Sequence, residues 1–406
     1  MGWVVDWLEL LGRWLHMITG VAWIGASFYF IWLDNHLEPP KDPQDDVNGV
    51  GGELWAVHGG GFYQARKFRG APPAMPETLH WFKWEAYTTW LSGMFLLILI
   101  YWVGAEIYLI DPSVAELSVG QAVGLGAGYL LGGWILYDQL CKSPLGRNER
   151  ALSAVLFVLL VLAAWSLCQL FGGRGAFIHY GALIGTIMVA NVAHIIIPGQ
   201  RRMVQALEAG QPINPADGLR GKQRSVHNTY LTLPVLFVMI SNHYAVTYSG
   251  PWNWLILIGM TVSGALIRVW FVDRHKGNQS PMTLVLAAIA LALTALLANG
   301  KLALPTRTAA SASPTSAVAD APAAVTTETI TGIILARCTG CHAAEPTWPG
   351  FVAPPAGVIL ETPADIEHDK DRVYEQTVRL RAMPIGNLTG ITDQERELIA
   401  TWYESL

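Results

Sequence analysis

Eight apolar runs occupy most of the first 300 residues of this 406-residue chain. Each is long enough to cross the ~30 Å hydrocarbon core of a bilayer, which takes ~20 helical residues. The runs lie at about residues 10–33, 86–105, 119–137, 152–171, 176–197, 228–247, 252–272 and 281–299. Only 14% of all residues are charged, against about 25% in an average soluble domain. This pattern predicts an integral membrane protein, and the net charge of −5 without a basic tract excludes nucleic acid as a partner.

Lysine and arginine are distributed very unevenly among the loops between these runs. Loops 34–84, 138–151, 198–227 and 273–280 hold fifteen of them, whereas the N-terminus and loops 106–118, 172–175 and 248–251 hold only Arg174. Basic residues are enriched in cytoplasmic loops. We therefore expect a multi-pass protein of the bacterial inner membrane with both chain ends in the periplasm.

The third run carries a repeated small-residue pattern. Gly120, Gly124, Gly128 and Gly132 recur every fourth residue. Small residues at this spacing let helix backbones approach closely in lipid. The pattern therefore predicts a tight helix contact along this face.

The composition changes after the last run and predicts three parts: an integral membrane domain at 1–300, a linker at 301–326 and a small domain at 327–406. The linker is rich in Ala, Pro, Ser and Thr and cannot build a core. In the last part, apolar spacing predicts helices at 328–337 and 393–404, the second with a capping box formed by Thr392 and Glu395. The predicted fold class is all-α, with eight membrane helices and a C-terminal domain similar to class I cytochromes c.

The first of these two C-terminal helices leads into Cys338-Thr-Gly-Cys341-His342, the CxxCH attachment signature of c-type haem. The thiols add to the haem and His342 lies beneath the iron. Met383, the only Met after this motif, is the expected sixth ligand, with His368 as the alternative. A zinc site would need four N or S ligands, and a thioredoxin-like motif would need a βαβ context that is absent. The motif therefore predicts one covalent haem c.

Histidines within or beside the spans form two groups by topology. His58, His80, His194 and His227 fall on the cytoplasmic side, and His179 and His243 on the periplasmic side, with His16 about midway along the first run. Ionisable side chains in membrane segments suggest function, as a general base or a haem b ligand. Glu85 and Arg268, near span ends, are candidates to touch a polar substrate, and Glu9 and Arg13 are spaced to pair.

Several stretches resemble the bacterial membrane-bound, cytochrome c-linked urate oxidases, also called urate hydroxylases. These stretches are residues 13–25, 79–86, 227–234, 241–244, 338–342 and 383–389. The resemblance covers essentially the full length. It implies oxidation of urate to 5-hydroxyisourate in purine breakdown, with electrons passing through haem c to a periplasmic or membrane acceptor such as a cytochrome c or terminal oxidase, without hydrogen peroxide.

The implied reaction needs a base, donors for the purine oxygens and an electron outlet. The candidate bases are His16, His194, His227 and His243, and Asn228 and Asn242 are candidates to read the purine edge. A substrate site on the cytoplasmic side would lie most of the ~30 Å core away from haem c. We therefore expect either a site in the periplasmic half, near His16, His179 and His243, or a haem b relay with His179 and His243 as ligands.

Two other functional classes remain open. The first is a quinol or other dehydrogenase that reduces haem c. The second is a membrane anchor or transporter that only carries an electron-transfer haem. A transporter is expected to show internal repeats with broken helices, and the sequence has no clear repeat. A simple membrane anchor does not need histidines that are grouped on the two sides of the membrane, as they are here.

Overall fold

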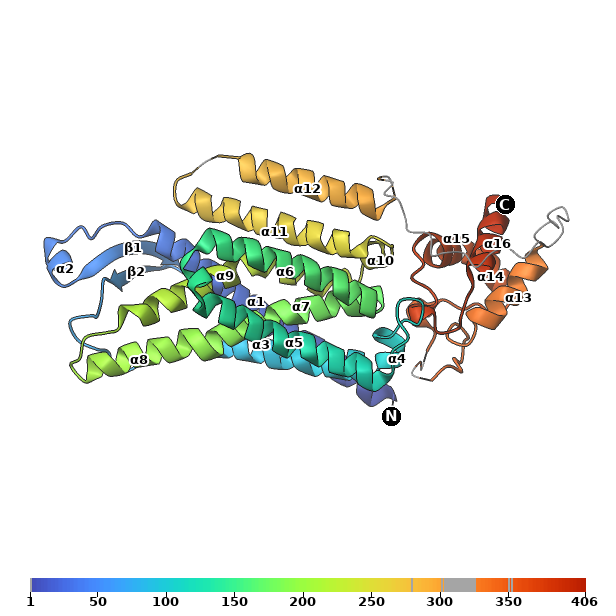
Figure 1. Cartoon of the computed structure of the whole chain (residues 1–406), viewed down its shortest axis with the longest axis horizontal. Helices are drawn as coiled ribbons and strands as arrows, with labels where there is room; N and C mark the ends of the chain where they lie inside the picture. The colour runs from blue at the N-terminus through green and yellow to red at the C-terminus, as the bar shows by residue number, and fades with distance from the viewer. Residues whose placement is uncertain (1, 279, 301, 303–325, 350, 352) are drawn as a thin grey trace.

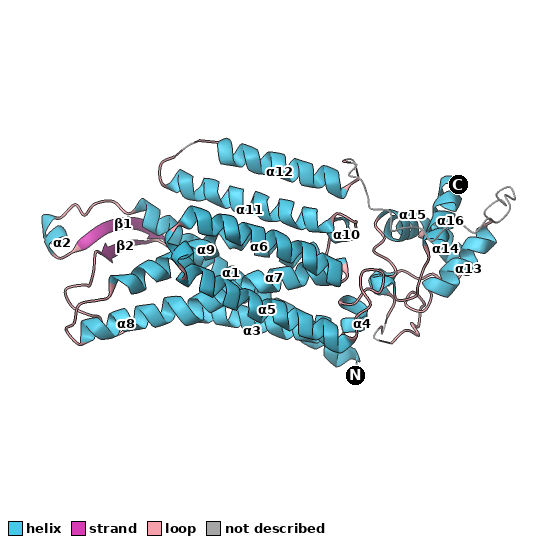
Figure 2. Cartoon of the chain, viewed as in Figure 1, coloured by secondary structure: helices cyan, strands magenta, loops and turns pink. Residues whose placement is uncertain are grey.

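A computed structural model describes residues 2–278, 280–300, 302, 326–349, 351 and 353–406. The described chain is mostly helical (Figure 2). Figure 1 shows long helices side by side in a bundle, with a β-hairpin at one end. The C-terminal helices form a separate group at the other end, which also carries the N-terminus.

Helices occupy all eight predicted runs. They are α1 (Gly2–His36), α3 (Trp84–Leu96) with the π-helix η1 (Leu97–Trp102), α5 (Val119–Lys142), α6 (Glu149–Leu170), α7 (Gly173–Ala190) with the π-helix η3 (Asn191–Ile196) and α8 (Ile197–Glu208), α9 (Pro215–Ser241), α11 (Asn253–His275) and α12 (Met282–Ala298). By length and composition, five helices in the described part of the chain are apolar enough to cross a membrane: α1, α5, α6, α7 to α8, and α11. The apolar helix α12 is shorter.

The helix ends follow from local side-chain chemistry. Ser118 and Gln121 form a capping box at the start of α5, and the Asn148 side chain caps α6. Asn214 caps α9, which begins with a proline, so this helix starts well before the predicted apolar run. The same run was expected to continue to residue 247, but α9 ends at Ser241 and a separate turn, α10 (Ala245–Tyr248), follows.

The loop between the first two runs contains a β-hairpin that the all-α prediction did not include. Strand β1 (Val50–His58) pairs antiparallel with β2 (Gly61–Phe68), beside the short helix α2 (Pro43–Val47). Gly59 and Gly60 both have positive φ, as the two-residue turns favoured in hairpins require. Lys67 of β2 pairs with Asp34 of α1 at 2.8 Å, which ties the hairpin to the bundle.

The predicted close packing through the glycine stripe of α5 is wrong. A methyl group built on Gly120, Gly124, Gly128 or Gly132 would meet no described atom within 4 Å. Two other glycines of α5 make the close contacts instead: Gly126 faces the His179 ring, and Gly133 faces the Leu183 side chain. Three glycines of the stripe line an apolar cavity of about 1050 Å³ that is also lined by α6, α7, α9 and α11.

The C-terminal domain packs around a core that includes Ile330, Ile334, Ile366, Ile399 and Trp402. Both predicted helices are confirmed, as α13 (Thr327–Arg337) and α16 (Asp393–Glu404), and so is the capping box of Thr392 and Glu395. Between them lie α14 (Pro363–His368), α15 (Lys370–Tyr374) and the short helices η4 (Pro355–Gly357), η5 (Glu375–Arg379) and η6 (Ile385–Asn387). Apart from residues 302 and 326, the predicted linker lies outside the described residues.

One turn of the C-terminal domain lies directly against the bundle. The helical turn η6 lies against α4 (Ala105–Tyr108), which follows Gly104 at the end of the second run. A methyl group built on Gly386 would come within 2.9 Å of the carbonyl oxygen of Ile110. The backbone of the turn therefore sits directly on the end of the bundle.

Candidate functional site

The four residues predicted to hold a haem line one cavity in the C-terminal domain. This cavity has a volume of about 500 Å³. Cys338, Cys341 and His342 reach it from the segment after α13, and Met383 reaches it from the segment before η6. His368 is exposed at the end of α14 and is not among the lining residues, so the geometry favours Met383 over His368.

Hydrogen bonds fix both expected axial ligands. The Nδ1 atom of His342 lies 3.0 Å from the carbonyl oxygen of Val358, which leaves Nε2 for a partner inside the cavity. The Met383 amide donates to Gln376, and its carbonyl accepts from Arg396 at 2.9 Å. Burial raises the pKa of the Cys338 thiol to about 12 and also raises the pKa of Cys341, so both are neutral thiols at neutral pH. Within the described residues, no three His, Cys, Asp or Glu side chains are grouped so that they could hold a metal ion.

A second cavity of about 340 Å³ lies between α1, the segment before α3, η3 and α9. Its volume is at the lower end of the range for small-molecule sites, about 300–1,000 Å³. The lining combines aromatic rings, amides and hydroxyl groups, which suits a flat heterocycle better than an aliphatic chain. The lining residues are Trp23, Ile24, Ala26, Ser27, Phe30, Ile31, Asp34, His80, Trp81, Phe82, Met188, Val192, Ile196, Gln200, Ser225, Asn228 and Thr232.

This cavity between α1, η3 and α9 has a buried floor and an open mouth. Met188, Asn228 and Thr232 at the floor are buried. Asp34, His80, Gln200 and Ser225 are exposed and form the mouth. Asp34 pairs with the hairpin, so the mouth opens toward the end of the bundle that carries the hairpin and the excess of basic loop residues.

Three of the stretches that carry the sequence resemblance meet at this cavity. Trp23 comes from residues 13–25, the His80 to Phe82 segment comes from residues 79–86, and Asn228 comes from residues 227–234. These stretches are far apart in the chain. Their convergence on one concave, mixed-polarity surface makes this a candidate substrate site. It lies toward the hairpin end of the bundle, and none of His16, His179 and His243 lines it, so this cavity does not meet the expectation of a site near those histidines.

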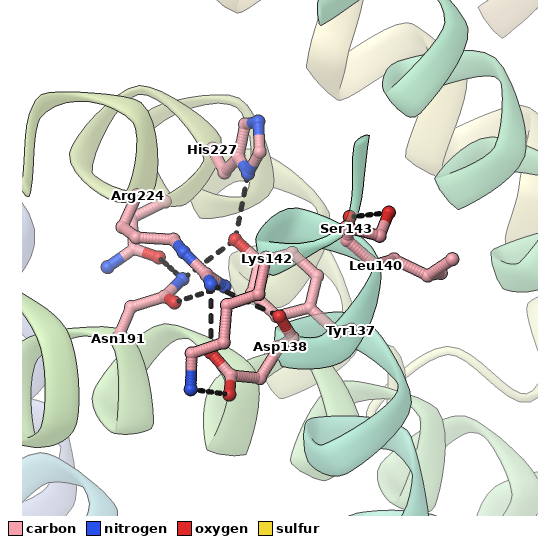
Figure 3. A network of polar contacts seen from close by, with 9 residues as sticks. Tyr137, Asp138, Leu140, Lys142, Ser143, Asn191, Arg224 and His227 are labelled. Atoms are coloured by element: carbon pink, nitrogen blue, oxygen red, sulfur yellow. Dashed lines mark hydrogen bonds and ion pairs between the residues drawn. The ribbon is translucent and has the colours of Figure 1, made fainter. Parts of the chain in front are cut away.

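Asn228, which lines the cavity, belongs to a buried network of hydrogen bonds. Figure 3 shows this network. The Asn228 side chain donates to the carbonyl of Met188 and accepts from Asn191, both at 2.9 Å. Asn191 also donates to the Tyr137 hydroxyl at 3.0 Å and accepts from Arg224 at 3.3 Å. These bonds fix the orientation of the Asn228 amide, and each of its two ends keeps one position for a ligand.

An ion pair anchors this network. Arg224 donates to the Asp138 carboxylate at 2.8 Å and lies over the Tyr137 ring, 4.8 Å from its centroid. Its side chain is only 3% exposed, and the Asp138 side chain is 10% exposed. Lys142 approaches the same carboxylate to 2.5 Å from the solvent side. A buried charge is tolerated where it is paired and hydrogen-bonded, as it is here.

Sequence reasoning missed Tyr137, Asp138 and Asn191. Asp138 and Lys142 lie at the end of an apolar run, where charged residues are common. The sequence alone therefore does not distinguish them from ordinary charged residues at a helix end. Asn191 belongs to the π-helix η3, whose extra residue per turn shifts the side-chain register within a long helix. A polar residue in the middle of an apolar span was the one available signal.

The structure separates the histidines that were predicted to act as bases. His227 bonds the Tyr137 hydroxyl at 2.8 Å and so joins the network behind the cavity (Figure 3). His194 is exposed and stacks on Trp134, and His243 is exposed beyond the end of α9. His16 contacts the carbonyl oxygen of Thr89 and the Ser92 hydroxyl on α3. Their role as bases stays a prediction.

The residues proposed for haem b do not fit that group. His179 is fully buried, its Nε2 accepts from Trp102 at 3.1 Å, and its Nδ1 lies 2.9 Å from the carbonyl oxygen of Gly175. Gly126 packs against the same ring, which leaves no room beside it for a macrocycle. His243 is exposed, so the two do not form a ligand pair.

Other predicted polar residues lie at the end of the bundle near the C-terminal domain. Asn242 accepts from the Tyr101 hydroxyl at 3.2 Å and from Arg174 at 3.4 Å. The predicted pairing of Glu9 with Arg13 is confirmed, with Nε 2.8 Å from the carboxylate. Arg174, the one basic residue in the group of loops at this end, is therefore engaged with an amide.

Comparison with known proteins shows the family to which the helical bundle belongs. No curated protein and no solved structure matches the chain. A family model described as "Urate oxidase N-terminal" matches residues 2–299. This range includes every helix of the bundle, the hairpin and the candidate substrate site. The chain therefore belongs to the urate oxidase N-terminal family.

Proposed function

We propose that this protein oxidises urate to 5-hydroxyisourate in the bacterial inner membrane and passes the electrons to a haem c in its own C-terminal domain. The observation that carries the proposal is the family match over residues 2–299, together with the CxxCH cavity in the remaining part of the chain. The apolar helices support a multi-pass arrangement. The uneven distribution of basic residues supports periplasmic chain ends.

The overall chemistry sets what the protein must provide. Urate and one water give 5-hydroxyisourate, two protons and two electrons. The protein must therefore hold an electron-rich anion, take up protons and give the electrons an outlet. The lining of the cavity between α1, η3 and α9 offers amide and hydroxyl groups for the first task.

The C-terminal cavity fits a haem c. Cys338 and Cys341 would hold the porphyrin covalently, and His342 and Met383 would hold its iron. When bound, the haem would accept one electron at a time and deliver it to an external acceptor. The groups around the cavity then have defined tasks: the backbone carbonyl of Val358 orients His342, and the Arg396 side chain holds the segment that carries Met383.

The contact between η6 and α4 gives a first prediction. Changing Gly386 to Ala adds a methyl group close to the carbonyl oxygen of Ile110, so the C-terminal domain is expected to dock less well. Urate-dependent haem reduction is expected to slow severalfold in stopped-flow absorbance, whereas reduction by dithionite stays unchanged. Gly390→Ala is the matched control, because Gly390 also has positive φ but its added methyl group meets only the end of Arg337, at 3.9 Å. Equal slowing in both variants would contradict the docking role.

The proposal is tested by the visible spectrum of the purified protein in detergent under anaerobic conditions, before and after urate is added. The expected result is a c-type α-band that rises on urate addition, with 5-hydroxyisourate as the product. A haem that dithionite reduces but urate does not would overturn the proposal. A lack of haem in protein matured where c-haem is attached would overturn the assignment of the C-terminal domain.

One observation favours quinol as the alternative reductant. The apolar cavity beside α5 has Tyr137 and His227 among its lining residues. An apolar groove with a hydroxyl and an imidazole at one end suits a lipid-soluble quinol. The same spectroscopic experiment, repeated with a quinol in place of urate, distinguishes the two functions.

A further inference from the structure

We propose that the apolar cavity beside α5 holds a lipid-soluble quinone that accepts the electrons released by urate, and that Tyr137, His227 and Glu149 carry protons between water and its head group. Helices α5, α6, α7, α9 and α11 line this cavity. The electron donor in this inference rests on the proposed function, whereas the binding site does not. The quinone is a second acceptor beside haem c, and not a reductant that replaces urate.

The lining of this cavity restricts the class of ligand. Most of its residues are apolar, and none of the described lining residues is Lys, Arg, Asp or Glu. A phospholipid head group or another anion therefore finds no charged partner in it. The volume of about 1050 Å³ is just above the usual range for small-molecule sites, about 300–1,000 Å³. A large, neutral and mostly hydrocarbon ligand fits these properties.

Four lining residues are also exposed, so the cavity is open toward the outside of the bundle. They are Leu125 and Leu136 of α5 and Phe157 and Trp165 of α6. Both helices are long and apolar enough to cross a membrane. A hydrophobic molecule dissolved in a bilayer can therefore enter the cavity without passing through water.

The glycines of α5 keep the cavity open and long. Gly124, Gly128 and Gly132 line it, and a methyl group built on any of them would meet no described atom within 4 Å. Tyr137, which also lines the cavity, follows Gly124 by thirteen residues, or about 20 Å along the helix. This elongated shape suits an isoprenoid tail with one polar head.

The polar end of the cavity is formed by Tyr137 and His227. The Tyr137 hydroxyl lies 2.8 Å from Nδ1 of His227 and accepts a hydrogen bond from Asn191 at 3.0 Å. A phenol has one proton and two lone pairs, so a hydroxyl that donates to His227 keeps one lone pair for a ligand. A quinol oxygen can donate to that lone pair.

A chain of proton carriers leads from this end to the surface. The Nε2 atom of His227 lies 3.4 Å from the Glu149 carboxylate, and the Glu149 side chain is 58% exposed. In the tautomer with its proton on Nδ1, His227 donates to Tyr137, Tyr137 donates to a quinone oxygen, and Nε2 accepts from protonated Glu149. A saturated lipid chain needs no such path, which favours a quinone as the occupant.

The candidate substrate cavity lies on the other side of the same wall of α7 and α9. Tyr137 and Asn228 are linked through Asn191 by two hydrogen bonds. Consecutive residues of the two helices also divide between the cavities: Ile187, His227 and Leu231 line the apolar cavity, and Met188, Asn228 and Thr232 line the cavity between α1, η3 and α9. The quinone head thus lies beside that cavity, whereas the C-terminal domain lies at the far end of the bundle.

The reaction balances without another oxidant. Urate and water give 5-hydroxyisourate, two protons and two electrons, and a quinone takes up two electrons and two protons to form a quinol. The electrons cross the wall between the cavities, and the protons enter through Glu149. A quinone accepts both electrons of one urate molecule, whereas a haem accepts one at a time.

The binding site is tested with decylubiquinone, added without urate to the full-length protein in detergent. Binding is read from the saturable quenching of tryptophan fluorescence, because Trp165 lines the cavity. Gly128→Leu places a side chain inside the cavity and is expected to weaken binding about tenfold or more. Gly120→Leu is the matched control, because Gly120 belongs to the same stripe and also has no described atom within 4 Å of an added methyl group, but is not among the lining residues. Equal binding in the two variants would overturn the site.

The acceptor role is tested by the ultraviolet absorbance of decylubiquinone after urate is added under anaerobic conditions. The wild-type protein is expected to reduce the quinone, Gly128→Leu to do so severalfold more slowly, and Gly120→Leu to match the wild type. Urate that reduces the haem but not the quinone would overturn the acceptor role and leave the proposed function intact. Urate that reduces neither would overturn the proposed function and the electron donor with it.

Glu149→Gln tests the proton path at an exposed residue. Quinone reduction by urate is expected to slow severalfold with a larger solvent isotope effect, because an amide cannot pass a proton to His227. Quinone binding is expected to be unchanged. Glu208→Gln is the control, since Glu208 is exposed at the end of α8 and lines neither cavity. A wild-type rate and isotope effect in Glu149→Gln would show that the protons take another path.

Discussion

Replacing both Cys338 and Cys341 by serine is expected to abolish covalent haem and, with it, all urate-dependent reduction of the C-terminal domain. Serine cannot form the thioether bonds, and the two thiols line the same cavity as His342 and Met383. The measurement is haem-dependent staining of the protein after denaturing electrophoresis, together with the visible spectrum. The loss is expected to be complete rather than partial, because two covalent bonds are removed.

The control for this prediction is the double variant with serine at Cys141 and Cys168. Both are free cysteines in the bundle, far from the CxxCH motif in the chain. Full haem staining is expected there. Haem that stays attached to the Cys338 and Cys341 double variant would show that the CxxCH motif is not the attachment site.

Asp138→Ala is expected to give the largest loss of stability in the bundle. The change leaves the buried Arg224 guanidinium without its carboxylate, and breaking a buried pair in this way costs about 3–5 kcal/mol. The thermal midpoint in detergent, followed by tryptophan fluorescence, is expected to fall by roughly 6–20 °C. Because Arg224 also holds Asn191, which orients Asn228, urate binding is expected to weaken as well.

Lys142→Ala provides the comparison. Lys142 pairs with the same carboxylate, but its side chain is 53% exposed. Pairs of this kind contribute about 0–1 kcal/mol, so its midpoint is expected to change little. Equal losses in the two variants would mean that the carboxylate acts through its surface partner and not through Arg224.

Patterns that repeat along one helix could be predicted from the sequence. A helix lies at each of the eight predicted apolar runs, and the spacing of Glu9 and Arg13 predicted their ion pair. In the C-terminal domain, Thr392 and Glu395 gave the helix start, and the CxxCH motif with one later methionine gave the lining of the cavity. Each of these depends on residues close in the chain or on a motif whose chemistry fixes its partners.

Two local patterns were misread or overlooked. The glycine stripe of α5 was predicted to pack against another helix. A stripe of glycines shows only that one helix face lacks side chains, and it does not show which element lies against that face. The Gly59-Gly60 pair between two mixed-polarity segments is a hairpin signal that the search for membrane spans passed over. In both cases the information was in the sequence, but its meaning depended on the neighbouring element.

The sequence by itself determined the helices, their order and the residues of the C-terminal cavity, because these follow from periodicity, capping and thiol chemistry within short segments. Only the tertiary structure decided which polar residues meet. Asn191 of η3, Asn228 of α9 and Tyr137 of α5 form one hydrogen-bonded network although they are far apart in the chain. The same holds for Arg268, whose Nε and Nη2 atoms are buried without a hydrogen-bond partner among the described residues. Whether a buried charge has a partner depends on packing between helices, and no pattern within a single helix encodes it.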